Sequence, residues 1–226
     1  MKDRKAYIID LLRETYQGAS TELEFETPFQ LLVATMLAAQ STDKQVNKVT
    51  RVLFQDYGTP LSMDTLSAEE IAEKINSVGL YRNKSKAIKA MSHLLLERYE
   101  AQVPSVLEAL ISLPGVGRKT ANVVLSNAFD IPAFAVDTHV FRTSRRLGLA
   151  SGNTPEKVEQ ELMQVFQKED WKDAHHWLIF HGRRTCMAKK PACQRCTLAQ
   201  LCDSEDKILD QGEVEGEDKR QQQSQV

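Results

Sequence analysis

Four cysteines constrain the fold of this chain more than any other feature of its sequence. Cys186, Cys193, Cys196 and Cys202 are spaced C-x6-C-x2-C-x5-C within 17 residues, and the 226-residue chain has no others. The N-terminus is charged, and its only apolar run is short and interrupted, so it predicts neither a signal peptide nor a membrane span. We therefore expect a cytoplasmic protein whose reduced thiols bind a metal centre instead of forming two disulfides.

The cysteine spacing favours an iron–sulfur cluster over zinc. Zinc ribbons bring together two C-x2-C knuckles from distant parts of a chain, whereas this chain has one such knuckle, Cys193–Cys196, flanked by single cysteines. Four thiolates on one winding loop are typical ligands of a [4Fe–4S] cluster. Zinc is the second interpretation, and four unrelated buried cysteines the third.

The charge is unevenly distributed along the chain. The net charge is −2, but residues 203–226 carry eight acidic and three basic residues, which leaves +3 on residues 1–202. Residues 203–226 are acidic and Gln-rich, and we expect them to be disordered. The basic residues of the longer part are clustered, which suits contact with a phosphate backbone, although each cluster could equally be a solvated helix face. The clusters are Arg118 and Lys119; Arg142, Arg145 and Arg146; and Arg183, Arg184, Lys189, Lys190 and Arg195.

Helical periodicity and helix punctuation recur along the chain, and no segment alternates as a strand would. Pro28 predicts the first turn of a helix that runs to about Gln40. Asp43 is expected to cap the next helix, and Ser67 with Glu70 has the spacing of a capping box. Other helices are predicted over about 82–99, 104–113, 118–129, 138–147 and 171–184, with one more from Pro155. The sequence therefore predicts an all-α fold.

A glycine turn between two predicted helices is a candidate DNA-binding element. In the segment from Leu113 to Lys119, Gly115 and Gly117 can take positive φ and let bare backbone approach a ligand. Arg118 and the free N–H groups of the following helix complete an anion site that suits a DNA phosphate. The segment L-P-G-V-G-R-K-T between two helices matches the helix–hairpin–helix DNA-binding motif.

Lys119 can be interpreted as a phosphate ligand or as a nucleophile. The helix N-terminus and Arg118 should lower the pKa of its amine, and a neutral amine can form a Schiff base. The extended segment that ends at Asp137 can span roughly 26 Å, enough to return across the about 18 Å of the preceding helix. A carboxylate at Asp137 could then stabilise a cationic sugar intermediate and relay protons, although a simple N-cap would look the same.

From about Glu24 to Cys202 the chain strongly resembles the endonuclease III family of DNA glycosylases. The resemblance rests on the cysteine loop and on five other segments. These are L-A-A-Q-S-T-D at 37–43, V-G-L-Y at 78–81, L-P-G-V-G-R-K-T-A at 113–121, V-D-T-H at 136–139 and H-H-W-L-I-F-H-G-R at 175–183.

This resemblance implies two helical domains with a catalytic cleft between them. Residues 21–132 would form a six-helix barrel with the helix–hairpin–helix, and residues 1–20 with 133–202 the cluster domain. The resemblance also assigns roles to single residues. Lys119 would be the nucleophile and Asp137 its partner, Gln40 would fill the gap left by the extruded base, and Leu80 would wedge against the opposite strand. Lys189 and Lys190 would touch phosphates, and the cluster would be structural.

The predicted function is base excision repair. The enzyme would remove oxidised pyrimidines from duplex DNA and cut 3′ to the abasic site by β-elimination through a lysine Schiff base. We expect a monomer, associated with the nucleoid and not with a membrane. One alternative is a mismatch adenine glycosylase, whose family lacks a lysine at the position of Lys119 and has a further C-terminal domain. Another is a non-catalytic DNA-binding or redox-sensing iron–sulfur protein, which would not need Asp137 beside Lys119. The sequence leaves lesion preference open.

Overall fold

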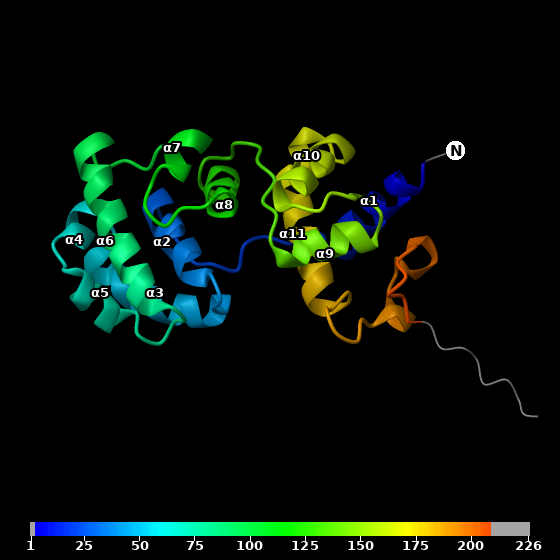
Figure 1. Cartoon of the computed structure of the whole chain (residues 1–226), viewed down its shortest axis with the longest axis horizontal. Helices are drawn as coiled ribbons and strands as arrows, with labels where there is room; N and C mark the ends of the chain where they lie inside the picture. Colours follow the sequence, from blue (N-terminus) through cyan, green and yellow to red (C-terminus); the bar gives the residue numbers. More distant parts are fainter. Residues whose placement is uncertain (1–2, 209–226) are drawn as a thin grey trace, which may run out of the picture.

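The structure, a computed structural model, describes residues 3–208. Over these residues the chain forms eleven α-helices and three short 3-10 helices, with no strand. The predicted all-α fold is confirmed. Figure 1 shows two lobes side by side, and the chain crosses between them twice, before α2 and before α9.

The first lobe is built around α2 (Pro28–Ala38). Every residue of α2 from 29 to 37 is buried, and the helix packs against α3, α6 and α8. Burial of this apolar segment is the main source of stability in the lobe. The other helices of this lobe are α3 (Asp43–Tyr57), α4 (Pro60–Asp64), α5 (Ala68–Lys74), α6 (Tyr81–Arg98), α7 (Leu107–Ile111) and α8 (Arg118–Ala128).

The second lobe is built around α11 (Trp171–Arg184), in which every residue from 174 to 182 is buried. It packs against α1 (Arg4–Thr15) and α9 (Thr138–Arg146), while α10 (Pro155–Val165) contacts α9. The apolar side chains of this lobe form a core separate from that of the first lobe. After α11 the cysteine loop contains the 3-10 helices Cys193–Arg195 and Ala199–Leu201.

Helix starts follow the local punctuation of the sequence. The Thr27 side chain accepts a hydrogen bond from Gln30 N, and Ser67 with Glu70 forms the predicted capping box, which is confirmed. The prediction that Asp43 caps α3 is wrong, because the Thr42 side chain accepts the bond from Gln45 N and Asp43 is the first residue of the helix. The Asp43 carboxylate is therefore available for other contacts.

Three helices differ from the sequence prediction. Helix α7 is shorter than predicted, because Val106 is extended and its first helical residue is Leu107. Helix α1 was not predicted, since Ile8 and Leu12 are its only buried residues and make a weak periodic signal. Helix α4 was also missed, although its Thr59-Pro60 start repeats the Thr-Pro signal of α2.

The segment predicted to be disordered is described only as far as residue 208. Within it, Asp203 pairs with Arg4 and Asp206 pairs with Arg146, both on the second lobe. The prediction for residues 209–226 lies outside the described residues. No helix within residues 3–208 is long and apolar enough to span a membrane.

Candidate functional site

The glycine turn before α8 uses its two glycines in different ways. Gly115 has φ +75°, and a Cβ there would lie 2.7 Å from the Ala87 Cβ, so only glycine fits. The expectation of a positive φ at Gly117 is wrong, because its φ is −90°. A Cβ at Gly117 would meet nothing within 4 Å, so this residue leaves the N-terminus of α8 open to solvent.

Arg118, predicted to contact DNA, is paired with a carboxylate of the other lobe. Its Nε and Nη2 donate to the two carboxylate oxygens of Glu159 on α10, at 2.9 and 2.7 Å. The Glu159 side chain is 7% exposed, and that of Arg118 is 41% exposed. Such a bidentate pair is strong, so a phosphate could bind this guanidinium only by competing with Glu159.

Lys119 and Asp137 come from different lobes and line the same cavity. Lys119 lies in the first turn of α8, and Asp137 is the N-cap of α9, where its Oδ1 accepts from Val140 N at 2.8 Å. The cavity has a volume of about 60 Å³. Asp137 is therefore an N-cap, as one of its two sequence interpretations predicts, and it also lines the cavity that contains Lys119.

The pKa of Lys119 is lowered, chiefly by burial of its amine. The charges of Asp137 and Asp43 oppose this shift, and that of Arg183 adds to it. More than a third of the surface of Lys119 is exposed to solvent, but its amine lies among protein atoms, and the pKa depends on the surroundings of the amine. The sequence predicted the direction of this shift but credited part of it to Arg118, whose charge is paired with Glu159.

The other residues that line the cavity include Asp43, His175 and Arg183, none of which was predicted as a site residue. Arg183 Nη1 lies 2.9 Å from both Asp43 Oδ2 and Glu22 Oε2, and so joins α11 to the first lobe. His175 and Arg183 are eight residues apart with Ile179 midway, which places all three on one face of α11. This spacing is the sequence signal that could have identified them.

His175 is a neutral group in this cavity. Burial lowers its pKa to about 4, so the ring is uncharged at neutral pH. Its Nδ1 lies 2.7 Å from Ala135 O, and since a carbonyl can only accept, the proton is on Nδ1. Nε2 therefore carries a lone pair.

Gln40 and Leu80 lie on two loops that contact each other. Both have a left-handed backbone, with φ of 58° and 59°. The loops are joined by a hydrogen bond of 3.0 Å from Gly79 N to Ser41 Oγ. Leu80 is 53% exposed although it is apolar. An exposed leucine in a strained conformation requires a reason outside core packing.

The four cysteines surround one cavity, with Leu147 and His181 in its wall. None of the four forms a disulfide. The pKa of Cys196 is raised by burial and by the negative charge that Cys186, Cys202 and Cys193 would carry as thiolates, so the four sulfurs interact. Within residues 3–208, no group of three or more His, Cys, Asp or Glu residues is arranged to hold a metal ion. Lys189 and Lys190 are exposed on the same loop.

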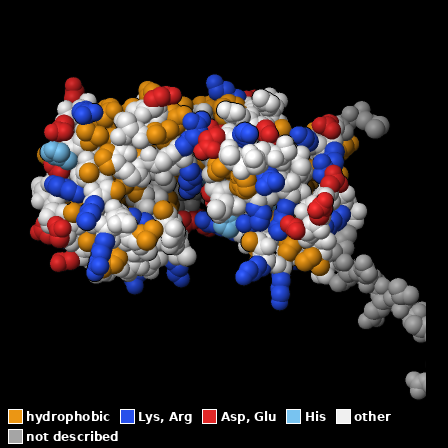
Figure 2. Space-filling model, viewed as in Figure 1, with side chains coloured by type: hydrophobic (Ala, Val, Ile, Leu, Met, Phe, Trp, Pro, Cys, Tyr) orange, Lys and Arg blue, Asp and Glu red, His pale blue; other side chains and the backbone are white. Residues whose placement is uncertain are grey.

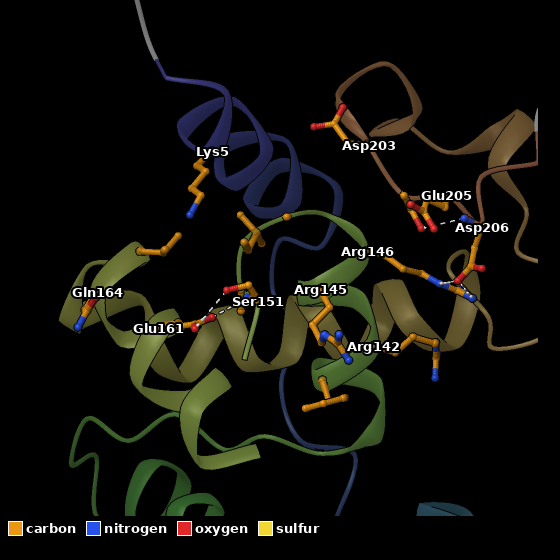
Figure 3. Close-up of a pocket in the computed structure, with 16 residues that line it drawn as sticks. Lys5, Arg142, Arg145, Arg146, Ser151, Glu161, Gln164, Asp203, Glu205 and Asp206 are labelled. Carbon is orange, nitrogen blue, oxygen red and sulfur yellow. Dashed lines mark hydrogen bonds and ion pairs between the residues drawn. The ribbon is translucent and has the colours of Figure 1, made fainter. Parts of the chain in front are cut away.

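A larger cavity, of about 820 Å³, lies elsewhere, between α9, α10 and residues 203–206 (Figure 3). Its charged groups are largely paired with the protein itself. Arg146 contacts Asp206, and the Glu161 carboxylate accepts from the backbone N–H groups of Ser151 and Gly152. Neither Lys119 nor Asp137 lines this cavity, so its size does not make it the reactive site.

The surface between the lobes also suits DNA. Figure 2 shows this surface hollowed where the lobes meet, with Lys and Arg side chains along its edges. Positive charge beside a groove attracts a phosphate backbone.

Comparisons with known proteins agree on one relationship. Residues 33–168 match the profile described as HhH-GPD superfamily base excision DNA repair protein. The chain is 47% identical to endonuclease III of Rickettsia conorii over 87% of this chain and 93% of that protein. It is 45% identical to endonuclease III of Escherichia coli K12, over 92% and 98% of the two chains.

Solved structures give the same result. A trapped covalent endonuclease III–DNA intermediate has a TM-score of 0.85 and 44% identity over 90% of this chain and 97% of that one. A thermostable thymine-DNA glycosylase, at 21% identity and a TM-score of 0.80, shares the fold.

Proposed function

The chain belongs to the endonuclease III family of base excision repair glycosylase/abasic-site lyases, and we propose that Lys119 and Asp137 carry out its reaction. The observation that carries this proposal is their meeting in one cavity from different lobes, where burial lowers the pKa of the amine. A lysine that only bound phosphate would gain nothing from a lowered pKa, because it needs its charge.

In the proposed reaction, the neutral Lys119 amine attacks C1′ of the extruded nucleotide, and the bond from C1′ to the base breaks. The base leaves with a proton. The nitrogen loses its proton and the sugar ring opens, which gives a Schiff base. A proton then leaves C2′ and the 3′ phosphate departs, which cuts the strand by β-elimination. Water finally releases Lys119.

Asp137 would stabilise the positive charge that forms during this reaction and would accept protons from it. Its carboxylate, held by Val140 N, would stabilise the cationic sugar and accept protons in turn. The cavity of about 60 Å³ is well below the roughly 300–1,000 Å³ of pockets that enclose a ligand. The extruded nucleotide would therefore occupy the groove outside, with C1′ at the cavity mouth.

We propose duplex DNA with oxidised pyrimidines as the substrate, bound by a monomer. The open N-terminus of α8 at Gly115 and Gly117 would bind a phosphate, and Lys189 with Lys190 would bind another. Gln40 would fill the gap in the duplex and Leu80 would wedge the opposite strand. Their exposed, left-handed positions on touching loops support these roles. Arg118 would join the phosphate contacts only when released from Glu159.

We further propose that the four cysteines bind a [4Fe–4S] cluster. Free thiols around one cavity suit this cofactor. Zinc is the second candidate, because one C-x2-C knuckle flanked by single cysteines differs from the two knuckles of a zinc ribbon. When bound, the cluster would hold the loop that carries Lys189 and Lys190. We also propose two domains, residues 21–132 and residues 1–20 with 133–202, because the first range contains all of one core except Ala133 and the second range contains the whole of the other core.

The test is borohydride trapping on a duplex with an abasic site. The wild-type protein should give a covalent protein–DNA adduct, because borohydride reduces the Schiff base. Lys119→Gln should bind the duplex and give no adduct, whereas Lys48→Gln, on an exposed part of α3, should trap normally. Full strand cleavage by Lys119→Gln would return this residue to the phosphate-binding role.

A further inference from the structure

Lys84 is a buried lysine that no step of the proposed reaction uses. It lies in the first turn of α6 and is 7% exposed. Its ammonium donates to the carbonyl oxygens of Leu37 and Ala39, at 2.8 and 2.6 Å. Burial lowers its pKa, and no carboxylate of residues 3–208 opposes this shift. Burying a charge without an opposite charge nearby is energetically costly, so the buried position of Lys84 calls for a structural or functional reason.

The two carbonyls belong to the end of α2 and the turn that follows it. The backbone at Ala39 has φ −58° and ψ 114°, Gln40 has φ 58°, and Ser41 N donates to Ala38 O at 3.1 Å. These angles define a type II turn with Gln40 at the position that normally requires Gly or Asn. A left-handed conformation is unfavourable for a residue such as Gln, because its Cβ crowds the following carbonyl oxygen.

A type I turn would relieve this strain by rotating the peptide group between Ala39 and Gln40. The rotation would give Gln40 a negative φ, and it would also swing the Ala39 oxygen to the other side of the turn. That oxygen would then leave the Lys84 ammonium. The hydrogen bond from Lys84 therefore favours the strained turn over the relaxed one.

The same residue is connected to Leu80. Lys84 N donates to Leu80 O at 3.1 Å, in the first turn of α6. Gly79 N donates to Ser41 Oγ, and a Cβ at Gly79 would lie 3.1 Å from Gln40 O. The loops of Gln40 and Leu80 therefore fit together closely, and Lys84 contacts both, one with its side chain and the other with its backbone.

We propose that Lys84 is a positioning residue that holds the type II turn at Gln40 against the loop of Leu80, so that both side chains are preset to enter duplex DNA. The inference rests on the proposed roles of Gln40 and Leu80. Presetting a strained pair removes the cost of ordering it at each encounter with DNA. The ammonium also lies at the negative end of the α2 dipole, which favours its charge.

The test compares trapping on duplex DNA with trapping on single-stranded DNA, because only in a duplex can Gln40 fill a gap and Leu80 wedge an opposite strand. Lys84→Met removes the ammonium and keeps an unbranched side chain. The rate of borohydride trapping on an abasic duplex should fall by about 10- to 100-fold. Trapping on the same strand without its complement should be unchanged. Lys86→Met, an exposed lysine on the same helix, should match wild type on both substrates.

A second variant tests the same contact from the opposite loop and does not depend on Lys84→Met folding. Gly79→Ala adds a methyl group against Gln40 O and should produce the same loss, confined to duplex DNA. Equal losses on both substrates, or no loss in either variant, would overturn the inference. Failure of the proposed function would look different, because wild-type protein would then form no adduct on either substrate.

Discussion

The contact between Arg118 and Glu159 predicts a competition between a carboxylate and DNA. Glu159 is nearly buried and holds the guanidinium in a bidentate pair across the two lobes. In Glu159→Gln the shape of the contact is kept, but the amide has one acceptor oxygen and no charge. Arg118 is then free to turn toward the groove, where the N-terminus of α8 is already open.

The expected magnitudes follow from this geometry. A hydrogen bond to a charged group contributes about 1.5–3 kcal/mol, and solvent at the half-exposed Arg118 reduces that value. The free energy of unfolding of Glu159→Gln should therefore fall by about 1–2 kcal/mol. Each added phosphate contact makes the log–log dependence of DNA affinity on salt steeper by about 0.9. Glu159→Gln should thus bind DNA more tightly at low salt and lose affinity faster as salt rises.

The assay is a titration of fluorescent duplex DNA at several salt concentrations, together with urea unfolding. The double variant Arg118→Gln/Glu159→Gln is the control, because it removes the released charge and should lack the additional salt dependence. A salt slope of Glu159→Gln equal to that of the wild type would refute the reasoning, since Arg118 would then contact no phosphate even when released.

Three other predictions follow from the site. Arg183→Gln removes a positive charge that lowers the pKa of Lys119, and it also frees the Asp43 carboxylate, whose negative charge raises that pKa. The amine should then become neutral only at higher pH, so the pH profile of trapping should move to higher pH. A shift to lower pH would contradict this sign. Replacing Lys189 and Lys190 by Ala should reduce the salt slope of binding by about 0.9 for each lost contact, and an unchanged slope would remove this loop from the DNA interface. The purified protein should be brown and contain about four iron and four sulfide per chain, whereas a colourless protein with one zinc would refute the cluster.

The parts of the fold that are local in sequence could be predicted. The start of α2 at Pro28 and the capping box of Ser67 with Glu70 depend on residues three or four positions apart, so the sequence contains the whole signal. The cap of α3 shows the limit of this reasoning. Thr42 and Asp43 are adjacent and either can cap a helix; Thr42 is the cap, and Asp43 contacts Arg183, 140 residues away.

The site could be predicted only where a residue's own chemistry identifies it. Lys119 and Asp137 are an amine and a carboxylate within recognisable motifs. Glu159 has no motif around it, and its effect on Arg118 comes from a side-chain contact between the two lobes. Lys84 is similar, because a lysine near a helix start is ordinarily a solvated residue. Its partners are backbone carbonyls, which every residue has, so no sequence pattern marks the contact.

Because Lys119 and Asp137 lie on different lobes, the proposed reaction depends on the contacts that hold the lobes together. The cavity keeps its shape only while the lobes keep their relative position, and polar contacts across the boundary include Arg118 with Glu159 and Arg183 with Asp43. Arg118 directly precedes Lys119 in the chain, and Arg183 itself lines the cavity. An anion that drew either arginine away would weaken the boundary beside the nucleophile. DNA is such an anion, so we expect its binding to be coupled, through these two side chains, to the geometry of the proposed catalytic pair.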